Sequence, residues 1–115
     1  MRILICGDRR WTDHNMIKLV LLKYPLDSII IEGECRGADM IAKEEALKLG
    51  MTVEPYTAYW GKYGRAAGPI RNKRMLVMGK PDLVIAFHNN IAKSKGTANM
   101  LIQAKARNIP IMVYP

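Results

Sequence analysis

Short apolar runs alternate with segments of helical spacing along the whole chain, and this alternation restricts the fold more than any other feature. The apolar runs lie at residues 2–6, 27–32, 52–56, 82–87 and 109–114. Helical segments separate them, at residues 12–23, 38–49, 69–79 and 96–106. Such crossovers connect parallel strands and place helices on both faces of one sheet. The sequence therefore predicts an α/β fold, a three-layer Rossmann-like domain with a five-stranded parallel sheet in the order 3-2-1-4-5.

Length and composition fit one domain that covers residues 1–115. Half of the residues are hydrophobic, which is enough for a core without disulfides or metals. The two cysteines, Cys6 and Cys35, and the two histidines, His14 and His88, have no zinc-ligand spacing. The first residues are too short for a signal peptide, and no segment is long enough to span a membrane. We expect reduced thiols, a cytoplasmic location, no metal and no membrane contact.

Candidate binding residues follow the strands in the predicted topology. In such sheets the ligand crevice lies beyond the carboxyl ends of the strands, where the strand order reverses. Loops 7–13, 33–39 and 88–97 should meet there, together with the start of the third helix. The expected ligand-binding residues are Gly7, Asp8, Arg9, Trp11, Gly33, Glu34, Arg36, Gly37, Ala38, Asp39, Arg71, Asn72, His88, Gly96 and Thr97.

The chemistry of these residues favours a phosphorylated ligand. Glycines leave no Cβ in the way, and helix N-termini offer N–H groups to an anion. Arg9, Arg36 and Arg71 provide planar forks that suit two phosphates or a pyrophosphate. Trp11 either stacks on a purine or packs into the core. Each residue also has an ordinary structural interpretation, as a turn glycine, a helix cap or a surface charge.

Segment 57–68 is the least regular part of the sequence. Its aromatic residues Tyr59 and Trp60 form either a lid or an oligomer contact, and the sequence does not separate these two roles. Pro55 places the third strand at a sheet edge. Isolated domains of this kind often pair through helices or an exposed sheet edge, so we expect a homo-oligomer.

Five ordered motifs resemble the SLOG superfamily, which gathers the LOG and DprA-type Rossmann-like domains. They lie at residues 7–13, 33–39, 67–72, 80–87 and 96–97, and the chain is most similar to the YspA-like branch related to YpsA. The resemblance covers essentially the whole chain. It implies a nucleotide-derived ligand, such as an ADP-ribose- or NAD-like molecule or a cyclic signalling nucleotide. The protein would act as a sensor, or as a sequestering sponge of the kind that a phage encodes, without a cofactor.

One departure from the family pattern weakens the enzymatic alternative. The LOG enzymes carry Pro-Gly-Gly-x-Gly-Thr-x-x-Glu, whose glutamate serves catalysis. Here Gly96 and Thr97 are kept, the glycine pair is missing, and Met100 stands in place of the glutamate. A thioether cannot transfer a proton. A LOG-like phosphoribohydrolase that cleaves nucleoside monophosphates is therefore the second hypothesis, with Glu34 or Asp39 as substitute carboxylates and no residue assigned as catalytic.

The net charge of +8 arises from 18 Lys and Arg against 10 Asp and Glu. A basic protein attracts polyanions. The basic residues are spread along the chain, however, and form no arginine-rich arm. A DprA-like nucleic-acid binder is the third hypothesis, and it depends on the charge alone.

Overall fold

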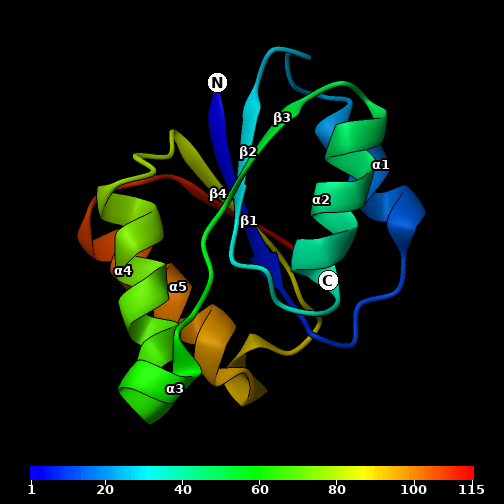
Figure 1. Cartoon of the computed structure of the whole chain (residues 1–115). Coiled ribbons are helices and arrows are strands. Elements are labelled where there is room, and N and C mark those ends of the chain that lie inside the picture. Colours follow the sequence, from blue (N-terminus) through cyan, green and yellow to red (C-terminus); the bar gives the residue numbers. More distant parts are fainter.

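The computed structural model describes all residues, 1–115. Its five parallel strands form one sheet in the order β3-β2-β1-β4-β5 (Figure 1). This result confirms the predicted fold class and strand order. The strands are β1 (Arg2–Gly7), β2 (Ile29–Glu32), β3 (Thr52–Pro55), β4 (Leu83–Phe87) and β5 (Ile111–Tyr114).

Helices cover both faces of the sheet, as Figure 1 shows. One face carries α1 (His14–Leu21) and α2 (Ala38–Lys48), and the other carries α4 (Ala67–Val77) and α5 (Lys95–Ala106). The short helix α3 (Trp60–Tyr63) and the 3-10 turn η1 (Gly64–Ala66) lead into α4, and the turn η2 (Ile91–Lys93) precedes α5. None of the helices combines the length and the hydrophobicity that a membrane span requires.

The central strand β1 is buried on both faces, which explains its continuous apolar sequence. Ile3 and Ile5 pack with the α1 and α2 side of the core, around Phe87. Leu4 and Cys6 pack with the α4 and α5 side. Successive side chains of a strand point to opposite faces, so each neighbouring pair contributes to both halves of the core.

The register brings the carboxyl ends of the strands to one edge. Gly7 at the end of β1 lies beside Phe87 at the end of β4. On the other side of the sheet, Glu32 at the end of β2 lies beside Pro55 at the end of β3. The loops that carry the candidate residues therefore leave the sheet at the same edge.

Two helices begin one or two residues earlier than predicted. Segment 57–68, expected to be the least regular, contains α3 and η1, and α4 begins at Ala67 rather than at Pro69. Pro69 still lies in the first turn of α4, where a missing N–H group leaves no hydrogen bond unmade. Helix α5 begins at Lys95 rather than at Gly96, because the hydroxyl of Ser94 caps it by accepting a hydrogen bond from the Thr97 N–H.

Candidate functional site: an arginine-lined cavity

Asp8 ties together the loops that follow three strands. Its N–H donates to the carbonyl of Phe87, at the end of β4, over 2.9 Å. Its own carbonyl accepts from the N–H groups of Trp11 and Ala38, each over 3.1 Å. The loops after β1, β2 and β4 therefore meet, as the sequence predicted.

Two glycines permit this close approach. A Cβ on Gly7 would overlap the carbonyl of Phe87 and lie 2.9 Å from the Cβ of Ala38. Gly37 has a φ of +77°, and a Cβ there would overlap the backbone of Asp8 and Arg9. A side chain at either position would separate the loops.

Asp39 closes loop 33–39 from inside. Its Oδ2 accepts a hydrogen bond from the N–H of Gly33 over 3.0 Å, and it lies 3.5 Å from the N of Cys35. The side chain is buried, and this burial raises the pKa of Asp39 to about 6, although the nearby Arg71 acts in the opposite direction. Asp39 was predicted to bind ligand, but its contacts assign it to the support of the loop.

Two glutamates lie beside this loop in very different environments. Glu34 has a φ of +61°, an unusual value for a residue with a side chain, and its N–H donates to Oε2 of Glu32 over 2.6 Å. Glu32 is fully buried, its Oε1 has no hydrogen-bond partner, and burial raises its pKa to about 8. The Glu34 carboxylate instead accepts from Lys43 over 2.8 Å, which lowers the pKa of Glu34. Burial thus favours the neutral acid at Glu32, and the contact with Lys43 favours the ionised carboxylate at Glu34.

Arg71 reaches from α4 into the loop after β2. Its Nη1 donates to the carbonyl of Gly33 over 2.8 Å and lies 3.3 Å from Sγ of Cys35, while its Nε donates to Oδ1 of Asn72 over 3.2 Å. Nη2 makes no hydrogen bond within the protein, and it is not fully buried although Arg71 as a whole is only 7% exposed. The bonds of Nε and Nη1 therefore fix Nη2 in position and leave its donors unpaired.

Asn72 connects this group to the start of α5. Its Nδ2 donates to the carbonyl of Gly96 over 3.3 Å and to Oδ1 of Asn99 over 3.1 Å. Since its Oδ1 also accepts from Arg71, Asn72 fixes the direction of the guanidinium. It is a positioning residue, and its own polar atoms are used within the protein.

The loops enclose a cavity of about 270 Å³. We call it the arginine cavity, because three arginines line it against one carboxylate, Glu34, which is already paired with Lys43. The excess of positive charge favours an anion. Trp60 supplies an aromatic wall and lies close to Gly68, where a Cβ would be 3.3 Å from the indole. The lining residues are Arg9, Gly33, Glu34, Cys35, Arg36, Thr57, Ala58, Trp60 and Arg71.

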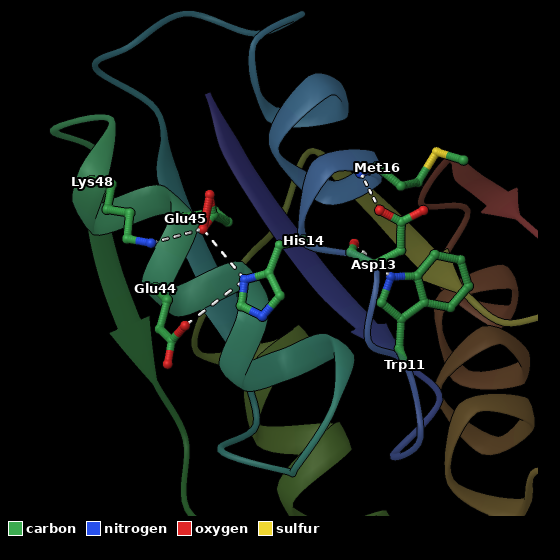
Figure 2. A network of polar contacts seen from close by, with 7 residues as sticks. All are labelled: Trp11, Asp13, His14, Met16, Glu44, Glu45 and Lys48. Atoms are coloured by element: carbon green, nitrogen blue, oxygen red, sulfur yellow. Dashed lines mark hydrogen bonds and ion pairs between the residues drawn. The ribbon is translucent and has the colours of Figure 1, made fainter.

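A second cavity, of about 300 Å³, shares Arg9 with the arginine cavity. Its lining includes Trp11, whose ring lies 5.5 Å from that of Phe87 and whose Nε1 donates to the Asp13 carbonyl over 3.0 Å. His14 lies 3.5 Å from the buried Glu45 and 3.9 Å from Glu44 (Figure 2). The lining residues are Arg9, Arg10, Trp11, Thr12, His14, Gly37, Met40, Ile41 and Glu44.

The predicted residues fall into three groups. The arginine cavity is lined by five of them, Arg9, Gly33, Glu34, Arg36 and Arg71. The second cavity is lined by Trp11 and Gly37 and again by Arg9. Asp8, Ala38, Asp39, Asn72 and Gly7 hold the loops together. His88 is buried, and its Nδ1 accepts from the N–H of Asn90 over 2.9 Å, while Thr97 is buried at the start of α5. His88, Gly96 and Thr97 line neither of these two cavities, and their ligand contacts stay predictions.

The sequence analysis missed Cys35, Thr57 and Ala58 as lining residues and left the role of Trp60 open. The last three follow β3, whose carboxyl end lies at the same edge as the others. The crevice was expected from the loops after the first, second and fourth strands only. The loop after the third strand leaves the sheet at the same edge, so the same topology also predicts Trp60 at the site.

Comparison with known proteins identifies the family. Residues 1–63 match the family model described as YAcAr, the YspA, cpYpsA-related SLOG family. The chain is 31% identical over 122 aligned residues to the Gene 61 protein of Mycobacterium phage D29, and the match covers 98% of this chain and 95% of the phage protein. No solved structure matches the chain. The protein belongs to the SLOG family, in its YspA and cpYpsA-related branch.

Proposed function

We propose that the arginine cavity binds the phosphates of a nucleotide-derived ligand. The observation that carries this proposal is Arg71, whose Nη2 donors are fixed by Asn72 and Gly33 and remain unpaired. Preorganised guanidinium donors are well suited to phosphate oxygens. Arg9 and Arg36 line the same cavity on exposed loops and would complete the anion site.

The two cavities support a ligand with two halves, such as ADP-ribose or NAD. Arg9 lines both of them, so a pyrophosphate beside Arg9 would direct one half of the molecule into each. Trp60 lines one cavity and Trp11 the other, and each indole offers a surface for a base or a ribose. SLOG membership supports the same class of ligand.

The protein would act as a sensor or would sequester a signalling nucleotide. The match to a phage protein along nearly the whole length of both chains is consistent with sequestration. A cyclic nucleotide is included among the ligands to be tested for this reason.

Calorimetric titration with ADP-ribose, NAD and cyclic ADP-ribose tests the proposal. We expect saturable binding of at least one of them, and a loss of about 10- to 100-fold in affinity for Arg36→Ala, because one charged hydrogen bond contributes about 1.5–3 kcal/mol. Arg107→Ala is the matched control, since Arg107 is an exposed arginine at the end of α5. No heat from any ligand, or equal affinity of Arg36→Ala and Arg107→Ala, would contradict the proposal.

The alternative functions have less support. Met100 is 1% exposed and packs in the core, so the position of the LOG glutamate provides no acid. Release of free base from nucleoside monophosphates, followed by chromatography, would favour the hydrolase. A gel shift that weakens steeply with salt would favour nucleic-acid binding; that hypothesis still depends on the net charge alone.

A further inference from the structure

The edge strand β5 is exposed and carries no charge. Its four residues are Ile111, Met112, Val113 and Tyr114. The first three are 39%, 41% and 43% exposed, so both faces of the strand reach solvent. An exposed apolar edge of this kind is a template for pairing with another strand.

The backbone of β5 shows which groups are available. The carbonyls of Pro110 and Tyr114 accept hydrogen bonds from Val84 and His88, each over 2.9 Å. Backbone groups alternate sides along a strand, so the even-numbered residues of β5 face β4. The N–H and C=O groups of Ile111 and Val113 therefore point away from the sheet.

The opposite edge of the sheet differs. Strand β3 contains Pro55, which has no N–H group, and Glu54, which forms an ion pair of 2.6 Å with Arg2. Proline and charge on an edge strand both prevent pairing with another chain. Only one of the two edges is protected in this way.

We propose that β5 pairs antiparallel with β5 of a second copy of this chain, which makes one continuous sheet across a two-fold axis. In this register Met112 lies opposite Met112 of the second copy, and Ile111 of one copy lies opposite Val113 of the other. Ile111 and Val113 then form a pair in which each N–H donates to the carbonyl of the other residue. The symmetry repeats this pair on the other side of the axis. These are the residues whose donors and acceptors point outward, so the edge is complementary to itself.

The absence of charge on β5 favours a second copy over a charged peptide, because a charged strand would lie against an apolar edge. The net charge of +8 on each chain opposes association of two copies, so the pairing should weaken at low salt, where this repulsion is least screened. At the edge itself, the N–H groups of each β5 meet the carbonyls of the other. The pairing is independent of the arginine cavity and of its ligand.

Sedimentation equilibrium of Val113→Lys tests the inference. We expect the wild-type protein to have twice the 13.0 kDa mass of one chain, and Val113→Lys to have the mass of one chain. Ile102→Lys, which adds the same charge to a 69% exposed isoleucine of α5, should remain a dimer. Far-UV circular dichroism verifies that each variant is folded.

Amide hydrogen exchange locates the contact without relying on a variant. The Ile111 and Val113 amides should exchange slowly at concentrations where the dimer forms and rapidly on dilution. A wild-type protein that is monomeric at all concentrations would overturn the inference. So would a dimer whose Ile111 and Val113 amides exchange rapidly, or a folded Val113→Lys that stays dimeric.

Discussion

Replacement of the buried Glu32 by glutamine should change how the stability of the protein depends on pH. Burial raises the pKa of Glu32 from 4.5 to about 8 in the folded protein. Between pH 4.5 and about pH 8, Glu32 is ionised in the unfolded chain and still protonated in the folded protein. The favourable contribution of Glu32 is therefore complete below pH 4.5 and is lost as the pH rises to about 8, at up to about 1.4 kcal/mol per pH unit.

Glu32→Gln lacks this titration. The amide oxygen can still accept the hydrogen bond from the Glu34 N–H, whereas the amide nitrogen has no partner. This unpaired group lowers the free energy of unfolding by about 1–3 kcal/mol at every pH. Relative to wild type, the free energy of unfolding of Glu32→Gln should therefore rise with pH. Between pH 5 and pH 8 we expect a gain of about 3 kcal/mol or somewhat less, since Glu34 and Asp39 titrate together with Glu32.

Urea unfolding followed by tryptophan fluorescence at pH 5, 6, 7 and 8 measures this difference. Glu44→Gln is the matched control, because it removes a carboxylate that is 58% exposed; its curve should run parallel to the wild-type curve. If the Glu32→Gln curve were also parallel to the wild-type curve, the assignment of Glu32 as a neutral buried acid would be wrong.

Three further predictions concern the loops and the thiols. Gly37→Ala should lose more than about 2 kcal/mol of stability in urea unfolding, because φ is positive and a Cβ would overlap backbone, whereas Gly61→Ala, where a Cβ meets nothing, should be close to neutral. Asp13→Ala should lose about 1 kcal/mol with the N-cap of α1, and a thermal melt that is unchanged would contradict this role. A thiol reagent should modify Cys35 and spare Cys6, which is buried and has a raised pKa, and ADP-ribose should protect Cys35; equal reaction of both thiols would contradict the burial.

The fold was predictable because the local pattern and the global topology agree. Apolar strands buried on both faces, separated by segments of helical spacing, are compatible with a parallel sheet and with few other arrangements. That topology alone placed Arg9, Arg36 and Arg71 at one edge, although 62 positions separate the first from the last. The sequence alone therefore predicts that distant loops converge.

The detailed site was less predictable, because it depends on side-chain contacts that leave no pattern. Ser94 caps α5 and takes the Thr97 N–H that was expected to face a phosphate. Asp39 turns inward to the backbone of Gly33. Helix α3 is only four residues long, too short for a periodic signal, so the sequence left this helix unpredicted.

A crystal structure of the protein with ADP-ribose would show whether the arginine cavity binds phosphates. We expect density for the pyrophosphate beside Arg9, within hydrogen-bond distance of Nη2 of Arg71, with one half of the molecule in each cavity. A ligand bound at another surface, or phosphates that avoid Arg9, Arg36 and Arg71, would contradict it.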